Sequence, residues 1–404
     1  MEIYYGRKVV NPVPGKVIGL VPKPSPKIIE GFGRRAEVGH LCKESGYSRV
    51  LLVTDRTLFG LGFHEVLADS LKKEGIECTV FSEIDSEPTA RIISAGRKAA
   101  VQSRAQCIIA LGGGSVMDSC KVIAAGARLR HLRTRELLIK FLAVPGKTLP
   151  MITIPSTAGT GAEITVGAIV KKNDGGSKGS TVIVGLNIIA TVLDSELMVR
   201  TPGRITAACG IDALSHGIEG YLADIDSGKD NERLSRECVR LVFENLPKVL
   251  DKPSDIQARQ AMCLAAHYGG NAINTQLAGY VHAFAHTLGA MYHLSHGEAI
   301  SLSILPVLRY QQPVCRDRMS ELASACGISS PSEDSFTSSD RFLDALEGLL
   351  KKCRLDISGS VVRREDYESI ISLVKRDAIN YSSPVVLNRM EITHILEEIR
   401  KIRI

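Results

Sequence analysis

Short apolar segments alternate with helical patterns through the first half of the chain, and this alternation limits the fold more than any other feature. Strands that alternate with helices build βαβ units around a parallel sheet. We therefore predict an α/β domain over residues 1–199. The predicted strands are 27–30, 49–54, 77–82, 106–111, 150–154 and 189–193. The predicted helices are about 34–46, 63–75, 88–104 and 115–127, and residues 166–186 have the pattern of a hairpin on the same layer.

The pattern changes after Pro202. Strand-like runs become rare, and helical periodicity continues to the C-terminus. A chain of 404 residues is also too long for a single hydrophobic core. We predict a second, all-α domain over residues 200–404. A site for a small molecule is expected in the cleft between the two domains.

Histidines are concentrated in the second half. Asp212 and His216 are four residues apart, a spacing that puts both on one helix face. Further downstream the segment VHAFAHTLGAMYHLSHGE brings four more imidazoles, and with His267 six of the ten histidines fall between positions 216 and 296. One carboxylate with several imidazoles is a ligand set for iron or zinc. The alternative for any single histidine is a hydrogen-bonded core residue, but several unpaired polar groups in one core would be costly. The four downstream histidines are His282, His286, His293 and His296.

A glycine-rich turn follows the predicted strand QCIIAL and opens the next helix. It consists of Gly112, Gly113, Gly114 and Ser115. Glycines let the backbone approach a pyrophosphate, and the free N–H groups of a helix start attract its charge. The usual G-x-G-x-x-G pattern is absent, so a purely structural turn is the alternative. A second polar glycine turn, PSTAGTGAE, follows the adjacent predicted strand and favours a nucleotide site.

Composition and charge exclude several classes of function. The ten cysteines are scattered and form no C-x-x-C pair, which is typical of reduced thiols in a cytoplasmic protein. The N-terminus has no pattern of a secretory signal, and no apolar run is long enough to span a membrane. The net charge of +6 is mild and no nucleic-acid motif accompanies it.

Four segments together resemble the iron-containing (group III) alcohol dehydrogenases. They are GGGSVMDSCK, IPSTAGTGAEIT, GIDALSHGIEGY and AGYVHAFAHTLGAMYHLSHGEA, and their order agrees with that family over roughly residues 25–400. The resemblance implies a dehydroquinate synthase-like fold, with an N-terminal dinucleotide-binding α/β domain and an all-α C-terminal domain. It also implies Fe²⁺, with Zn²⁺ as the alternative, held by Asp212, His216, His282 and His296.

The resemblance assigns further roles one residue at a time. His286 would take part in proton transfer near the nicotinamide and would not bind the metal. Asp55 matches a strand-end carboxylate associated with the adenosine ribose, and this favours NAD over NADP; the alternative is that Asp55 only caps the following turn. The other positions implied to contact the cofactor are Gly112, Gly113, Gly114, Ser115, Asp118, Thr153, Ser156, Thr157 and Thr160.

The chain departs from the family pattern at a few positions. Ser295 replaces a usual proline before the His-Gly pair, and we expect a looser turn there. Glu87 replaces a frequent asparagine, and residues 382–384 (SSP) replace a common Asn-Pro sequence beside the substrate pocket. The first 25 residues look like an added N-terminal segment.

The expected activity is the interconversion of a small alcohol with its aldehyde or ketone. A metal would stabilise the alkoxide as a Lewis acid, nicotinamide would take the hydride, and His286 would relay the alcohol proton. The alternatives are an NAD- and metal-dependent lyase resembling 3-dehydroquinate synthase and a catalytically silent nucleotide-binding protein. We expect no nucleic-acid or membrane partner, and a homodimer or higher homo-oligomer.

Overall fold

The computed structural model of the chain describes residues 21–84, 88–171, 178–223, 228–379 and 381–404. The described residues form two compact units. We call the unit formed by Val21–Thr157 and Gly161–Arg200 the α/β unit, and the unit formed by Ala158–Thr160 and Thr201–Ile404 the helical unit. Residues 1–20 of the N-terminal segment and Glu87, where the sequence suggested departures from the family, lie outside the described residues.

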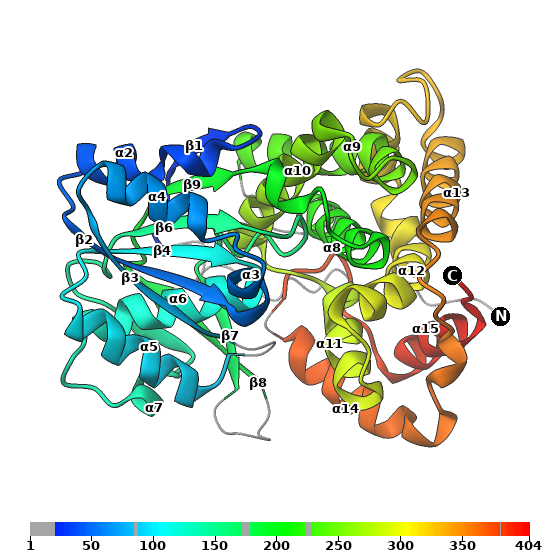
Figure 1. Cartoon of the computed structure of the whole chain (residues 1–404). Helices are drawn as coiled ribbons and strands as arrows, with labels where there is room; N and C mark the ends of the chain where they lie inside the picture. The colour runs from blue at the N-terminus through cyan, green and yellow to red at the C-terminus, as the bar shows by residue number, and fades with distance from the viewer. Residues whose placement is uncertain (1–20, 85–87, 172–177, 224–227, 380) are drawn as a thin grey trace. The chain divides into compact units, whose positions relative to one another are not determined.

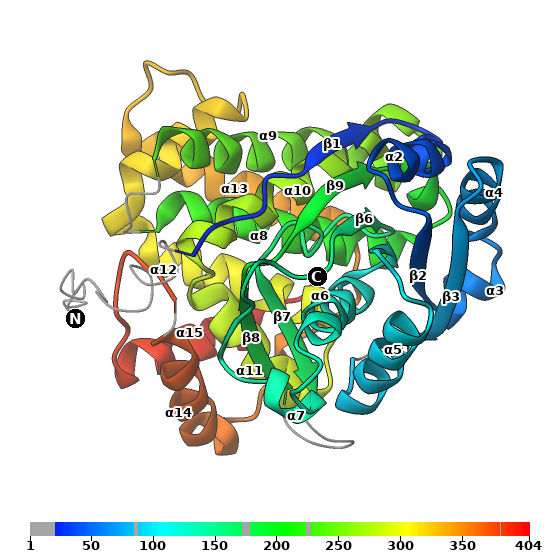
Figure 2. The same cartoon turned by 90° about the vertical axis from the view of Figure 1, so that its left-hand side faces the viewer.

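The α/β unit is built on a six-stranded parallel sheet with the strand order β1-β9-β6-β4-β2-β3. The central strand β4 is buried along its whole length, as expected for a continuous apolar run covered on both faces. Helices α2 and α4 cover one face, and α5 and α6 cover the other (Figures 1 and 2). The strands are β1 (Lys27–Glu30), β2 (Arg49–Asp55), β3 (Glu77–Ile84), β4 (Cys107–Gly112), β6 (Met151–Pro155) and β9 (Ile188–Leu193). The helices are α2 (Val38–Glu44), α3 (Arg56–Gly60), α4 (Glu65–Lys73), α5 (Ala90–Gln102), α6 (Gly114–Arg128) and α7 (Thr134–Leu137).

The direction of strand addition reverses between β2 and β4. From β2 the chain moves to the edge strand β3, then crosses back over β2 to β4 and continues to β6. Ligands of open α/β sheets bind beyond the carboxyl ends of the strands at such a reversal. The C-terminal ends of β2 and β4 therefore mark the position at which a nucleotide is expected.

The predicted hairpin forms, but in a sheet of its own. Strands β7 (Gly167–Lys171) and β8 (Lys178–Val184) pair antiparallel, and β8 also pairs with the short strand β5 (Phe141–Ala143). The sequence did not predict β5, because three residues are too few to show a period of two.

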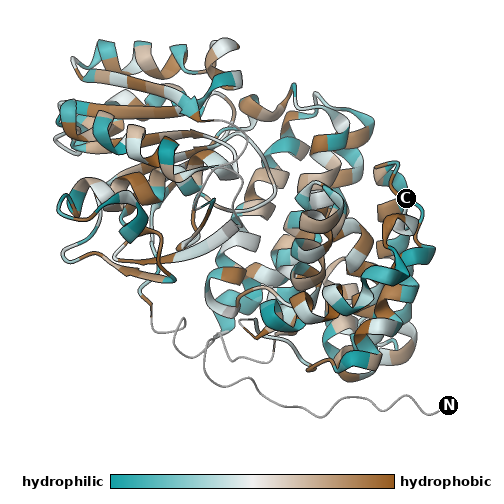
Figure 3. Cartoon of the chain, turned by 90° about the horizontal axis from the view of Figure 1, so that it is seen from below, coloured by the Kyte–Doolittle hydropathy of each residue, from teal (hydrophilic) through white to brown (hydrophobic). Residues whose placement is uncertain are grey.

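The helical unit contains no strand among its described residues. Its central helix, α8 (Gly203–Leu222), is buried on all sides from Gly210 to its end, and it packs against α9, α10 and α12. The other helices of this unit are α9 (Lys229–Asp251), α10 (Ile256–Gln276), α11 (Tyr280–Tyr292), α12 (His296–Ala325), α13 (Ser335–Cys353), α14 (Tyr367–Ala378) and α15 (Arg389–Lys401). Helices α9, α13, α14 and α15 are amphipathic, and hydrophobic and hydrophilic bands alternate on the helices in Figure 3. Among the described residues, no helix is long and apolar enough to cross a membrane.

Candidate metal centre and nucleotide loops

One face of the buried helix α8 carries three polar side chains. Asp212, His216 and Glu219 follow each other at spacings of four and three residues, so all three point the same way. Each is at most 6% exposed. Polar groups buried this deeply need partners, and α11 and α12 supply them.

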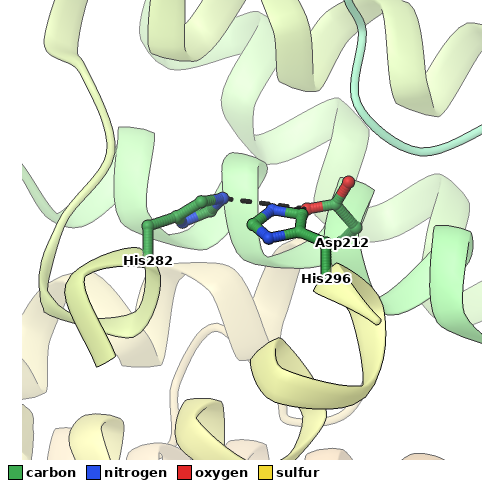
Figure 4. A group of neighbouring side chains, drawn as sticks. All are labelled: Asp212, His282 and His296. Carbon is green, nitrogen blue, oxygen red and sulfur yellow. Dashed lines mark ion pairs between the residues drawn. The ribbon is translucent and has the colours of Figure 1, made fainter. Parts of the chain in front are cut away.

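Two histidines from other helices meet the carboxylate of Asp212. The Nε2 atom of His296, the first residue of α12, lies 3.3 Å from Oδ1 of Asp212. The Nε2 atom of His282, in the first turn of α11, lies 3.7 Å from the same oxygen. The ligand atoms of these three side chains all lie within 4.8 Å of one another (Figure 4).

The spacing of these atoms fits one cation better than it fits a hydrogen-bond network. Four donors at about 2.1 Å from a tetrahedral ion lie roughly 3.4 Å from each other. Oδ1 of Asp212 and Nε2 of His282 are both buried, and neither has a hydrogen-bond partner among the described residues. A divalent cation between them would satisfy both atoms.

His216 lies beside the same carboxylate oxygen. Its Nε2 atom is 3.7 Å from Oδ1 of Asp212, and its ring stacks on that of His282 with the centroids 4.8 Å apart. It does not join the set of three whose ligand atoms are all mutually close. The structure thus brings His216, His282 and His296 close to Oδ1 of Asp212, with His216 outside the group of three mutually close ligand atoms.

The charges at this place suit a cation. Burial alone would raise the pKa of Asp212, but the surrounding imidazoles outweigh it and hold the pKa well below its ordinary value. Burial lowers the pKa of His216 to about 3. An ionised carboxylate and a neutral imidazole are the forms in which these residues bind a metal.

Glu219 is a functional residue that the sequence analysis missed. Its carboxylate accepts a hydrogen bond from Nδ1 of His282 and another from the backbone N–H of Val281 at 2.7 Å. A carboxylate on Nδ1 fixes the ring tautomer and directs Nε2 toward a metal. Burial opposes protonation of His282, but Glu219 and Asp212 outweigh it and raise the pKa to about 9, so Nε2 must release a proton when a metal binds. The signal was present in the sequence, because Glu219 continues the helix face of Asp212 and His216.

His286 lies one turn beyond His282 in α11 and faces a different group of side chains. Its Nδ1 atom is 2.9 Å from Oδ2 of Asp377 in α14 and 3.1 Å from the hydroxyl of Tyr381. Its ring stacks on His296 with the centroids 5.3 Å apart, and its side chain is 34% exposed. His293, which the sequence analysis left out of the ligand set, ends α11 in a left-handed conformation (φ 55°).

The turn before His296 is tight, contrary to the expectation for Ser295. Ser295 is the N-cap of α12, and its backbone N–H donates to the carboxylate of Glu298 at 2.8 Å. This is half of a capping box, in which serine is a preferred first residue. The replacement of proline by serine therefore preserves a defined helix start at His296.

The two glycine turns begin side by side at the ends of neighbouring strands. Gly112 pairs with Pro155 at the C-terminal ends of β4 and β6, and Ser156 donates from its backbone N–H to Gly112 at 3.0 Å. Gly113 is the N-cap of α6 and has no side chain that could cap the helix. A side chain at Gly113 would bring its Cβ to 3.5 Å from the hydroxyl of Thr157. The start of α6 therefore has no capping side chain where it follows β4.

Three of the cofactor positions have structural partners. The carboxylate of Asp118 pairs with Lys121 at 3.1 Å and accepts from the N–H of Ile169 at 2.9 Å, which joins α6 to β7. The hydroxyl of Thr153 is buried and lies 2.9 Å from that of Thr191. Asp55 caps α3, because Oδ1 accepts from the N–H of Leu58 at 2.8 Å.

Thr160 belongs to the helical unit and not to the α/β unit. It lies in Ala158–Thr160, a short segment that packs with the helices. A Cβ at Gly159 would come within 2.9 Å of Cys209, so the segment runs close to α8. The sequence had placed Thr160 with the other residues of the loop after β6, because chain proximity alone cannot show which unit a residue joins.

Comparison with known proteins decides the family. The family described as iron-containing alcohol dehydrogenase matches residues 24–193, and its C-terminal counterpart matches residues 206–400. The chain belongs to the iron-containing alcohol dehydrogenase family. An NAD-dependent methanol dehydrogenase from Bacillus methanolicus is 29% identical over 381 residues, which cover 92% of this chain and 97% of that protein.

Solved structures agree with the family. A 1,3-propanediol oxidoreductase superposes with a TM-score of 0.87 at 25% identity and covers 94% of this chain and 100% of its own. A sulfoacetaldehyde reductase from Bifidobacterium kashiwanohense, solved in complex with NAD⁺, has a TM-score of 0.83 at 26% identity and covers 93% of this chain and 97% of its own. These comparisons confirm the predicted fold class. The iron-containing alcohol dehydrogenase described here thus belongs to the oxidoreductases that act on CH–OH groups.

Proposed function

We propose that this enzyme oxidises a small primary alcohol to its aldehyde, and reduces the aldehyde in reverse, with NAD and one divalent iron ion. The cluster of Asp212, His282 and His296 carries the proposal, because its buried donor atoms face each other at distances that suit a single cation. The methanol, propanediol and sulfoacetaldehyde enzymes among its relatives all act on short carbon chains, which supports a small substrate.

The proposed metal ligands are Asp212, His216, His282 and His296, with Fe²⁺ as the first choice and Zn²⁺ as the second. A bound divalent cation would polarise the alcohol oxygen as a Lewis acid. Asp212 would supply the negative charge of the ligand set, and Glu219 would hold His282 in the tautomer that leaves Nε2 open. His286 would pass the alcohol proton toward solvent, which its partly exposed ring can reach.

We propose that NAD binds at the C-terminal edge of the sheet. Its pyrophosphate would lie on Gly112–Ser115 and beside Ser156 and Thr157, where the start of α6 offers N–H groups and the positive end of the helix dipole. Asp55 stands at the end of β2, the strand next to β4, and would contact the adenosine ribose. Asp118, Thr153 and Thr160 are the other cofactor contacts that we propose.

The formation of NADH, followed by its absorbance, tests the proposal. The full chain, loaded anaerobically with Fe²⁺ and supplied with NAD, is mixed with a series of primary alcohols of increasing length. We expect turnover that is highest with short alcohols and that fails without metal. No NADH from any alcohol, and no oxidation of NADH by the matching aldehydes, would contradict the proposed substrate class.

His282→Ala tests the metal site directly. The variant should lose bound metal and turnover and keep the circular dichroism of the parent protein. His293→Asn is the matched control, because it removes a histidine from the same segment while asparagine tolerates the left-handed backbone there. A His282→Ala variant with a full complement of metal would refute the ligand assignment.

Location, assembly and domain limits are also proposals. Most of the ten cysteines are buried, which suits reduced thiols in a compartment such as the cytoplasm. We propose a homodimer, which light scattering of the purified protein would test. We propose independent domains at 1–199 and 200–404, which limited proteolysis would test.

A further inference from the structure

Three side chains from separate parts of the helical unit form a hydrogen-bonded triangle. His286 comes from α11, Asp377 from α14, and Tyr381 from the segment after α14. Nδ1 of His286 lies 2.9 Å from Oδ2 of Asp377, and the hydroxyl of Tyr381 lies 3.1 Å from Nδ1 and 3.2 Å from Oδ2. The sequence analysis did not anticipate either partner, because they stand 91 and 95 residues from His286.

The chemistry of the three groups fixes the direction of the hydrogen bonds. An ionised carboxylate only accepts. Nδ1 of His286 and the hydroxyl of Tyr381 must therefore both donate to Asp377. With its proton held on Nδ1, a neutral His286 has its lone pair on Nε2.

One face of the His286 ring also packs against another side chain. It stacks on the ring of His296 at an interplanar angle of 24°, while Asp377 and Tyr381 hold its Nδ1 edge. The side chains of His286 and Asp377 are each about one third exposed, at 34% and 33%. Water could solvate both at this exposure, so the burial of polar groups alone does not explain why two side chains converge on one nitrogen.

We propose that Asp377 and Tyr381 are positioning residues, which hold His286 in one ring orientation and one tautomer so that Nε2 takes up and returns the alcohol proton. This inference rests on the relay role of His286 in the proposed function. When the alcohol is oxidised, the O–H bond breaks, Nε2 binds the proton, and the proton leaves to solvent. Asp377 stabilises the imidazolium that forms in between and does not itself take up the proton.

A double-mutant cycle tests whether Asp377 acts through His286. Turnover of the iron-loaded full chain is compared for the parent protein, His286→Gln, Asp377→Asn and the double variant. We expect His286→Gln to lower kcat by about 100-fold or more. Asp377→Asn should lower kcat by roughly 10- to 100-fold, and its KM for NAD and its metal content should stay at parent values. The double variant should match His286→Gln alone, because residues that act as one unit are not additive.

The tautomer supplies a readout that does not depend on turnover. The full chain is labelled with ¹⁵N-histidine and loaded with diamagnetic Zn²⁺, and the Nδ1–H signal of His286 is assigned by its loss in His286→Gln. Asp377→Asn should shift this signal strongly or abolish it. Tyr381→Phe should shift it less and lower kcat by roughly tenfold, because one of the two partners remains.

Matched controls separate positioning from general damage. Glu368→Gln removes an exposed carboxylate from the same helix α14, and Tyr367→Phe removes another tyrosine hydroxyl that binds a carboxylate. Both should leave kcat and the His286 signal unchanged. A further loss of kcat when Asp377→Asn is added to His286→Gln, or an unmoved His286 signal in Asp377→Asn, would overturn the inference. Normal turnover by His286→Gln would instead refute the relay role itself and the inference with it.

Discussion

Glu219 and Asp212 lie on opposite edges of the same imidazole ring, that of His282. Glu219 accepts from Nδ1, while Oδ1 of Asp212 lies 3.7 Å from Nε2. Both carboxylates belong to α8, seven residues apart, so one rigid helix fixes their separation. A single helix therefore fixes the position of His282 before any metal binds, and Glu219 keeps the proton on Nδ1 when Nε2 gives up its proton to a metal.

Glu219→Gln should weaken metal binding. A neutral amide stabilises the Nδ1–H tautomer less well, and its N–H₂ group can donate to Nδ1 and force the proton onto Nε2. We expect the dissociation constant for Fe²⁺ or Zn²⁺ to rise by about 10- to 100-fold. Calorimetric titration of the metal-free protein measures it. Glu232→Gln, which removes an exposed carboxylate of α9, is the control, and equal affinities in the two variants would argue against the role of Glu219.

Gly279→Ala should disturb the same contact by a steric route. A Cβ at this position would lie 2.6 Å from Oε1 of Glu219, so the carboxylate would have to move away from Val281 and His282. We expect weaker metal binding in the same direction as Glu219→Gln, and little additional loss when the two changes are combined. Gly348→Ala in α13, where nothing lies within 4 Å of the added atom, should leave metal binding at the parent value. Parent-like affinity in Gly279→Ala would show that Glu219 has room to adjust.

The sequence predicted the architecture well because the relevant signals are local. The apolar run of β4 is typical of a strand that is buried on both faces of a parallel sheet, and the glycine turn after it marks the start of α6. The strand β5 was missed, because Phe141–Ala143 is too short to carry a pattern.

The candidate site was predictable only in part. The ligand candidates were visible because Asp212 and His216 share a helix turn and the other histidines crowd into one segment. Their supporting residues were not, since Glu219 meets His282 across 63 residues and Asp377 meets His286 across 91. Such pairs depend on how helices pack, which no local spacing records. Asp55 shows the opposite limit. The structure displays the helix cap that the sequence analysis gave as the alternative role, and the contact of Asp55 with the adenosine ribose stays a prediction.

Glu397→Gln should change the dependence of stability on pH. Arg364 and Tyr367 bind the carboxylate at 2.9 Å and, with Arg364 as the main cause, lower the pKa of Glu397 from 4.5 to about 2. A carboxylate with a depressed folded-state pKa stabilises the fold above its unfolded-state pKa and loses this contribution as the pH falls toward the folded-state value. The variant should therefore be less stable than the parent near neutral pH, and the difference should shrink between pH 4.5 and about 2.

Thermal unfolding of Glu397→Gln and of the parent protein, at neutral pH and at a pH between 4.5 and about 2, measures this difference in stability. Glu368→Gln is the comparison, because its ion pair with Arg389 is about two thirds exposed on both sides and should contribute little at either pH. A pH-independent difference between Glu397→Gln and the parent would mean that the variant acts through packing and not through the charge.

Asp55→Asn should narrow the preference for NAD over NADP. Asparagine caps a helix as well as aspartate does, so the hydrogen bond from Leu58 to Oδ1 can persist while the negative charge is removed. The parent enzyme should prefer NAD, because a carboxylate at the end of β2 binds ribose hydroxyls and repels a 2′-phosphate. At a strand end open to water we expect the ratio of kcat/KM values to narrow by roughly tenfold, or ~1.4 kcal/mol. Measuring kcat/KM for both cofactors in both proteins tests this, with the unfolding temperature as the check on the cap. A parent preference for NADP would refute the assignment, and an unchanged ratio with an unchanged unfolding temperature would leave Asp55 as a helix cap alone.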